Sequence, residues 1–306
     1  TSDNPDGTFS YSSSDTSVAT ISGNIITIVG AGSTTITAIQ QETINYNLGS
    51  VSTIFTVNKA DPNIGELLIP TKTFNDPAFI ITQPTSNNPD GTFSYTSSDT
   101  SVATISGNEI TIVGAGSSII TATQEATSNY NSGSVFTTFT VNKADHVLSF
   151  SIEPKTYKDT AFVINPPTSN NPDGTFSYTS SNTSVATISG NIITIVGAGN
   201  TLITATQSET INFNSGRIST TFIVNKADPD IGELIILTKK FNDPAFEITQ
   251  PTSDNPDGTF SYTSSNTSVA TISGNIITIV GAGSTIITAT QSETSNYNSG
   301  SVFTTF

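Results

Sequence analysis

The stretch Tyr95–Thr123, YTSSDTSVATISGNEITIVGAGSSIITAT, decides the fold of this 306-residue chain. Its apolar residues are mostly β-branched and alternate with Ser and Thr, a period of two that is typical of half-buried strands. Turn-forming residues at Ser106–Asn108 and Gly114–Gly116 separate the strand segments. Apolar spacing of three and four is absent, so we predict strands and no helix.

The same stretch recurs along the chain at a constant period. The preceding run T-S-D/N-N-P-D-G-T-F-S-Y returns at spacings of 84, 83 and 84 residues, and its copies begin at Thr1, Thr85, Thr168 and Thr252. Such a period is long enough for each copy to bury a small core of its own, unlike the 20 to 50 residues of a solenoid repeat. We therefore predict a tandem array of small domains.

The recurring run V-N-K-A-D places the domain boundaries. It predicts a partial repeat at 1–59 (repeat 1), then 60–143 (repeat 2), 144–226 (repeat 3) and 227–306 (repeat 4, without its last residues). Outside the decisive stretch, repeat 2 has further strand patterns at Leu67–Ile69, Ala78–Thr82 and Val135–Val141. About seven short strands in each repeat are typical of an immunoglobulin-like sandwich without its disulfide.

Two short segments add detail to this prediction. The turn Asn88–Gly91, N-P-D-G, has a proline that presets φ, and we expect Gly91 to take a positive φ. The junction Asn58–Pro62 is short and is stiffened by its proline. The predicted fold class is all-β, with tandem immunoglobulin-like β-sandwich domains forming an extended rod of about 40 Å per repeat.

Composition excludes several classes of function. The chain has 24 acidic residues, 9 basic residues and one His, a formal net charge of −15, and it has no Cys, Met or Trp. So few cations cannot form a basic patch for nucleic acid, and thiolate metal sites, disulfides and cysteine nucleophiles are excluded. Apolar runs stay well below about 18 residues, so we predict no membrane insertion in this segment.

The run Tyr95–Thr123 and its copies from Tyr11, Tyr178 and Tyr262 resemble the bacterial immunoglobulin-like domains of group 2. These domains form tandem repeats in invasin-like and intimin-like surface proteins. The resemblance covers the whole chain through the pattern SxxTSVATIS…IVGAGSxxITA. It implies surface display, stalks and adhesion, and it implies no shared catalytic residues.

Acidic residues at the junctions are the candidate metal ligands. In an immunoglobulin-like sandwich the first segment and the N-P-D-G turn lie at one pole, so each V-N-K-A-D aspartate is expected near a turn aspartate. The three pairs are Asp61 with Asp90, Asp145 with Asp173, and Asp228 with Asp257. Carboxylates with loop carbonyls suit calcium, and the sequence suggests no other cofactor. The alternative is that the first of each pair is a solvated linker residue, paired with Lys59 in repeat 2, and the second a turn former.

Catalysis is not predicted. A Ser-His-Asp site needs a His in each copy, whereas His146 is the single His and lies at a junction. Any carboxylate pair would lie on exposed turns, without an apolar pocket to raise one pKa. The G-A-G turns lack the Lys and the helix of a phosphate-binding loop.

A loop aromatic recurs in each copy, at Tyr46, Tyr130, Phe213 and Tyr297. Such a residue either stacks on a sugar or fills the interface between neighbouring repeats. Phe213 lacks the hydroxyl of the other three, which favours the interface.

The leading functional hypothesis is a non-catalytic structural segment, a stalk or fibre, in a surface-displayed or extracellular repetitive protein. It would associate with copies of itself or present an adhesive tip, on a cell surface or, alternatively, in a virion surface fibre. The alternative function is a multivalent adhesin that binds carbohydrate or host protein through the repeat loops.

Overall fold

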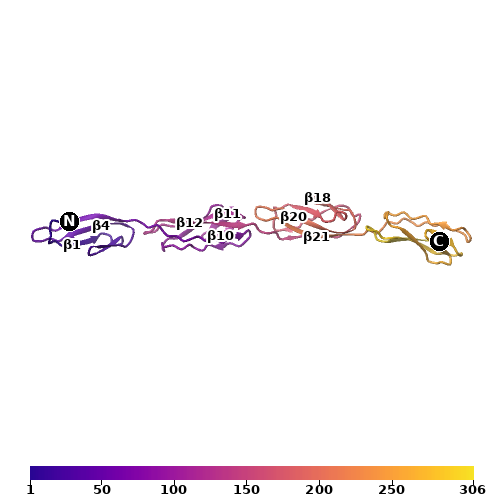
Figure 1. Ribbon diagram of the computed structural model, residues 1–306, viewed down its shortest axis with the longest axis horizontal. Helices are drawn as coiled ribbons and strands as arrows, with labels where there is room; N and C mark the ends of the chain where they lie inside the picture. The colour runs from indigo at the N-terminus through magenta and orange to yellow at the C-terminus, as the bar shows by residue number, and fades with distance from the viewer. The chain divides into compact units, whose positions relative to one another are not determined.

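The computed structural model describes all 306 residues, and each of its 27 regular elements is a strand (Figure 1). The all-β prediction and the absence of helix from the sequence pattern are confirmed. None of the elements is therefore a helix of the length and hydrophobicity needed to cross a membrane. The chain divides into two compact units, Thr1–Ala144 with Ile211–Phe213, and Asp145–Thr210 with Asn214–Phe306.

Repeat 2 shows the complete arrangement. Its strands are β6 (Lys72–Thr73), β7 (Phe79–Ile80), β8 (Phe93–Ser97), β9 (Ala103–Ser106), β10 (Glu109–Ile112), β11 (Gly116–Gln124) and β12 (Gly133–Asn142). They form a four-stranded sheet, β6-β12-β11-β8, and a three-stranded sheet, β7-β10-β9. All pairs are antiparallel except β6 with β12.

The core of repeat 2 lies between these two sheets. Ile110 from the three-stranded sheet and Ile120 from the four-stranded sheet are both fully buried in one cluster. Phe139 of β12 packs against Phe79 of β7, with ring centroids 5.7 Å apart. The alternating apolar residues of the decisive stretch thus face one another across a sandwich, as the period of two predicts.

The other repeats follow the same plan. Repeat 1 contains β1 (Phe9–Ser13), β2 (Ala19–Ser22), β3 (Ile25–Ile28), β4 (Gly32–Gln40) and β5 (Gly49–Val57). Repeat 3 contains β13 (Leu148–Ser149), β14 (Lys155–Thr156), β15 (Phe162–Val163), β16 (Thr168–Ser169), β17 (Phe176–Ser180), β18 (Ala186–Ser189), β19 (Ile192–Ile195), β20 (Gly199–Gln207) and β21 (Gly216–Asn225). Repeat 4 contains β22 (Phe246–Glu247), β23 (Phe260–Ser264), β24 (Ala270–Ser273), β25 (Ile276–Ile279), β26 (Ile286–Gln291) and β27 (Gly300–Thr305). Every sheet draws its strands from a single repeat.

The predicted strand at Leu67–Ile69 is not formed. Leu67 is 3% exposed and packs in the core, yet the nearest backbone pairing lies just before the segment: the bridge between Ile64 and Ser86 and the bond from Gly65 N to Thr85 O, 2.9 Å. Pro70 follows directly and has no N–H to donate to a ladder. The apolar pattern therefore reports burial here, not strand pairing.

Candidate functional site

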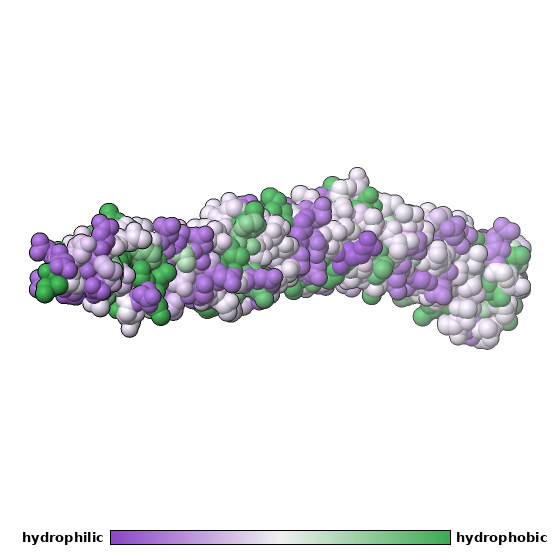
Figure 2. All heavy atoms as spheres, turned by 60° about the vertical axis from the view of Figure 1, so that its left-hand side comes forward, coloured by the Kyte–Doolittle hydropathy of each residue, from purple (hydrophilic) through white to green (hydrophobic).

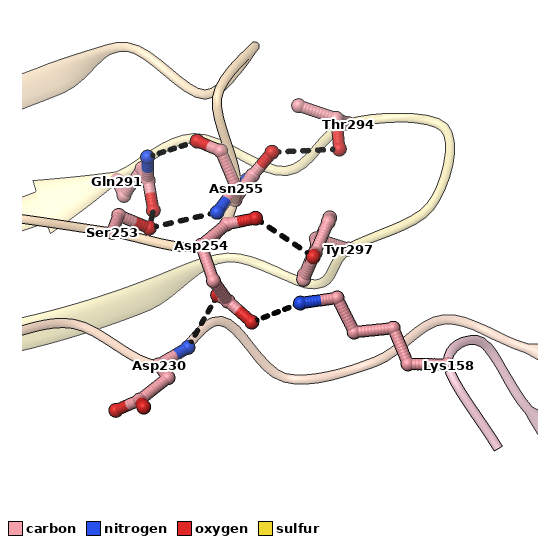
Figure 3. Close-up of polar contacts among 8 residues, drawn as sticks. All are labelled: Lys158, Asp230, Ser253, Asp254, Asn255, Gln291, Thr294 and Tyr297. Atoms are coloured by element: carbon pink, nitrogen blue, oxygen red, sulfur yellow. Dashed lines mark hydrogen bonds and ion pairs between the residues drawn. The ribbon is translucent and has the colours of Figure 1, made fainter. Parts of the chain in front are cut away.

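A buried polar cluster closes one pole of each repeat, and Figure 3 shows that of repeat 4. Gln291, at the end of β26, is 1% exposed, and its Nε2 donates to Asn255 O at 2.8 Å and to Gly258 O at 3.0 Å. Its Oε1 accepts from Ser253 Oγ at 2.6 Å. Thr294 Oγ1 donates to Asn255 Oδ1 at 3.2 Å, so the loop after β26 is joined to the N-P-D-G turn.

The cluster recurs in the other repeats with the same bonds. The equivalent glutamines are all buried: Gln40, Gln124 and Gln207. In repeat 2, Gln124 Nε2 donates to Asn88 O at 2.8 Å and to Gly91 O at 2.9 Å. This buried glutamine fixes the position of the N-P-D-G turn, because its removal would leave the turn carbonyls unsatisfied.

The prediction of a positive φ at Gly91 is wrong, because the backbone there does not adopt one. Glycine is required there for space: a Cβ would lie 2.5 Å from Asn88 Nδ2 and 2.8 Å from Gln124 Cγ. The buried glutamine, which the turn motif alone does not reveal, causes this close approach.

A second set of contacts joins neighbouring repeats. Asn296, on the loop after β26, accepts through Oδ1 a hydrogen bond of 2.8 Å from Ala198 N in the G-A-G turn of repeat 3. Equivalent bonds of 2.8 Å run from Ala31 N to Asn129 Oδ1 and from Ala115 N to Asn212 Oδ1. Each G-A-G turn in these three pairs is therefore bound by the first asparagine of an N-Y/F-N loop.

The loop aromatic lies inside this contact. Tyr297 is 4% exposed and packs edge-on against Tyr157 of repeat 3, with centroids 5.5 Å apart and an interplanar angle of 79°. Phe213 packs the same way on Phe74, at 5.5 Å and 81°. For these two residues the predicted packing between repeats is confirmed. The Tyr297 hydroxyl also donates to Asp254 O at 2.8 Å, a bond that Phe213 cannot make (Figure 3).

An ion pair lies beside Tyr297. Lys158, on the loop after β14, places Nζ 2.5 Å from Asp254 Oδ2 and 5.2 Å from the centroid of the Tyr297 ring (Figure 3). The other oxygen, Asp254 Oδ1, accepts from Asp230 N at 2.7 Å. Both carboxylate oxygens are thus bound, one within repeat 4 and one to repeat 3.

This ion pair shifts the pKa of both Lys158 and Asp254. The Lys158 ammonium holds the pKa of Asp254 below its ordinary range, mainly through the hydrogen bond to the carboxylate. Asp254, and then Tyr297, raise the pKa of Lys158. The contact therefore favours the charged forms of both groups.

The predicted calcium ligands lie at the same pole. In repeats 2, 3 and 4 the V-N-K-A-D aspartate accepts from an asparagine amide: Asp61 from Asn131 at 2.7 Å, Asp145 from Asn214 at 2.8 Å, and Asp228 from Asn298 at 2.7 Å. Their predicted partners Asp90, Asp173 and Asp257 lie on exposed turns. The structure contains no group of three or more acidic or His side chains placed to hold one metal ion. Calcium binding stays a prediction.

The suggested pairing of Lys59 with Asp61 is not seen. Lys59 Nζ donates instead to Thr127 O at 2.6 Å.

His146 has a structural position. It occupies the place of Pro62 and Pro229 in the other junctions, and it packs on Gly216, where a Cβ would lie 2.4 Å from His146 Nδ1. Its Nε2 lies 2.9 Å from Asn171 Nδ2 in the polar cluster. Proline packs on the equivalent glycines of repeats 2 and 4, so the imidazole takes over a packing role.

Two parts of this site were not predicted from the sequence. The buried glutamine has a signal, because T-A-T-Q or its variant ends the alternating strand in each copy. The Lys158–Asp254 pair also has a signal in the sequence, because some of the other copies have Asn at each of these two positions. Neither signal shows which residues meet, because that depends on how the loops of adjacent repeats approach one another.

The comparisons with known proteins found one matching family model and several similar solved structures. The model of the intimin immunoglobulin-like domain matches residues 248–293, and no curated protein matches the chain. The crystal structure of Drosophila N-cadherin EC1-4 is similar at 11% identity, over 97% of this chain and 91% of that chain, with a TM-score of 0.31. The S-layer protein rSbsC(31-844) is 17% identical over 96% of this chain and 49% of that chain, with a TM-score of 0.25. Because both TM-scores are low, we draw no functional conclusion from these two structures.

Proposed function

We propose that this chain is an array of bacterial immunoglobulin-like repeats, similar to the intimin domain whose model matches residues 248–293, and that it is a non-catalytic structural segment of a surface-displayed or extracellular protein. It acts as a stalk or as part of a fibre, either on a cell surface or, alternatively, in a virion surface fibre. Its partners are the neighbouring repeats, other copies of the chain, or an adhesive tip that it presents.

One observation supports this proposal above all: the bond from the alanine N–H of a G-A-G turn to the asparagine of the following repeat occurs three times. Tyr297 and Phe213 fill the space beside it in two of these contacts. Contacts repeated at each step of an array limit bending between neighbours, and a stalk needs this property. No catalytic role is assigned, and the single His is explained by packing on Gly216.

The face of the molecule shown in Figure 2 is suited to this role. Hydrophobic residues on the face in Figure 2 lie in small groups among hydrophilic ones. Large contiguous apolar patches usually mark binding sites, and dispersed ones do not.

Small-angle X-ray scattering of the 306-residue chain tests the stalk proposal. We expect an elongated particle whose largest dimension grows by about 40 Å per repeat. The Asn296→Ala variant is the comparison, since it removes one bond between repeats and leaves the cores intact. A compact particle for the unchanged chain would contradict a stalk.

A second function, multivalent adhesion, is favoured by two exposed aromatic residues. Phe136 and Phe303 occupy equivalent positions in repeats 2 and 4 and are 69% and 70% exposed. The same position is Ser52 in repeat 1 and Ser219 in repeat 3. If these rings bind carbohydrate, the double variant Phe136→Ser/Phe303→Ser should lose binding on a glycan array. If the unchanged chain and the double variant bind the array equally, or if neither binds, these rings are not the carbohydrate site.

A further inference from the structure

Two positions at the contact between repeats 3 and 4 differ from other copies. Lys158 stands where repeats 2 and 4 have Asn75 and Asn242. Asp254 stands where repeats 2 and 3 have Asn87 and Asn170. The two exchanged residues, one from each repeat, are in direct contact (Figure 3).

Lysine is unfavourable at its position for backbone reasons. The φ angle is 74° at Lys158 and also at Asn75 and Asn242. This left-handed conformation suits asparagine, whose short side chain tolerates it, and strains a residue with a long side chain. A lysine held there indicates that its side chain supplies something that asparagine cannot.

The charge of Asp254 is not needed within repeat 4. Its Oδ1 accepts from Asp230 N at 2.7 Å. In repeat 2, Asn87 Oδ1 accepts the equivalent bond from Asn63 N at 2.7 Å, so a neutral amide is sufficient. In repeat 3, Asn170 Oδ1 accepts the equivalent bond from Val147 N at 2.9 Å. What the carboxylate adds is a second, charged oxygen, and that oxygen faces Lys158.

We propose that Lys158 and Asp254 form a neighbour-selecting pair: the lysine-bearing pole of repeat 3 preferentially binds a repeat that has aspartate at the position of Asp254. The partner surface consists of Asp254 Oδ2 and the Tyr297 ring, which together surround the ammonium group. A repeat with asparagine at the Asp254 position presents no charge to the lysine. In this chain, repeats 1 and 4 have the aspartate, at Asp3 and Asp254, and repeats 2 and 3 have the asparagine. The proposal does not depend on whether the chain is a stalk.

The chain supplies its own variants for a test. Lys158→Asn and Asp254→Asn, singly and together, install residues that other repeats already have at these positions. Hydrogen exchange of the Ala198 amide reports opening of the contact, because its N–H donates to Asn296 of the next repeat. The Ala31 amide makes the equivalent bond to Asn129 in an unchanged part of the same molecule and is the internal control.

We expect each single variant to speed Ala198 exchange about two- to fivefold relative to Ala31, the range for an exposed ion pair. The second substitution should then add little, because the pair is already broken. Raising the salt concentration should speed Ala198 exchange more in the unchanged protein than in the double variant, which keeps the Lys226–Glu293 pair across the same contact.

A second readout separates the pair from a general loss of structure. Lys158→Asn removes backbone strain, so core amides of repeat 3 should exchange no faster than before, and their protection should rise, while Ala198 exchanges faster. Equal Ala198 exchange in all four proteins would overturn the proposal. So would independent, additive effects of the two substitutions, or a salt response that is as large in the double variant as in the unchanged protein.

Discussion

At the scale of single residues, this molecule depends on small differences between side chains with similar turn preferences. Asparagine, aspartate and lysine exchange at two positions of the contact between repeats, one on each side, and the structure gives each exchange a physical meaning. Asn75 relieves a left-handed backbone, whereas Lys158 accepts that strain and reaches Asp254. Glycine at the N-P-D-G turn is required by crowding from a buried glutamine.

The turn glycine provides a prediction about stability. Gly91→Ala should lower the free energy of unfolding of repeat 2 by about 1–3 kcal/mol, because its Cβ would overlap Asn88 and Gln124. Native-state hydrogen exchange of the β11 amides measures this. Gly49→Ala in repeat 1, followed through the amides of β4, is the control: no atom lies within 4 Å of its added Cβ, so the change should be below about 0.5 kcal/mol. Equal effects at both sites would contradict the crowding explanation.

The ion pair predicts how the contact between repeats 3 and 4 responds to pH. The lowered pKa of Asp254 means that its contribution is present above the ordinary value of about 3.9 and is lost as pH falls through the pKa in the folded protein. The raised pKa of Lys158 means that its contribution is present below about 10.4 and is lost only at more alkaline pH. The groups that face Lys158 are Asp254 and Tyr297, with Asp230 behind the carboxylate.

Acidification from about pH 5 to about pH 3 should therefore speed Ala198 exchange relative to Ala31 in the unchanged chain. The ratio removes the intrinsic effect of pH on amide exchange. The Lys158→Asn/Asp254→Asn protein should show a smaller change, because it keeps the Lys226–Glu293 pair at this contact. A ratio that is constant with pH in the unchanged chain would show that the pair contributes nothing to the contact.

Calcium binding at the junction aspartates is tested separately. If Asp61, Asp145 and Asp228 with their turn partners bind the ion, adding calcium should raise the temperature of thermal unfolding, and a chelator should reverse the rise. The amide bonds from Asn131, Asn214 and Asn298 already occupy one oxygen of each junction aspartate. An unchanged unfolding temperature would leave those amides as the only partners.

At the scale of the strand, the alternation of side chains determines which substitutions matter. On β12, Phe139 is fully buried while Phe136, three residues earlier, is 69% exposed. Phe139→Ala should destabilise repeat 2 by about 3–5 kcal/mol through loss of contacts and a residual cavity. Phe136→Ala should change stability by less than about 0.5 kcal/mol. Chemical unfolding of the two variants compares them, and similar losses would mean that the register of β12 is wrong.

The same scale shows what the sequence could and could not predict. Alternation in Tyr95–Thr123 predicted β9, β10 and β11 because both sides of the sandwich bury every second residue. It failed at Leu67–Ile69, where side chains are buried but the backbone does not pair with a neighbouring strand. Pro70, which follows, has no N–H to donate. The pole could be predicted only in part, since the repeats reveal its residues but contacts such as Lys158 with Asp254 depend on the approach of two loops.

At the scale of the whole molecule, each repeat has its own sheets, three in repeat 3 and two in each of the others, and strand pairing never crosses from one repeat to another. Repeats 2, 3 and 4 each have a separate buried cluster. Contacts between neighbours, by contrast, consist of a few hydrogen bonds, with an aromatic pair at two of the three contacts and, between repeats 3 and 4, the ion pairs Lys158–Asp254 and Lys226–Glu293. We therefore expect neighbours to be coupled without losing their separate folding transitions.

Unfolding the single chain under force tests this expectation most directly. If each repeat closes its own core, the trace should contain separate rupture events, each lengthening the chain by on the order of 250 Å for the roughly 80 residues released. The Lys158→Asn/Asp254→Asn variant should keep the same step length. Steps about twice as long, or one rupture of the entire chain, would show that the repeats unfold as larger units and would contradict the independence of their cores.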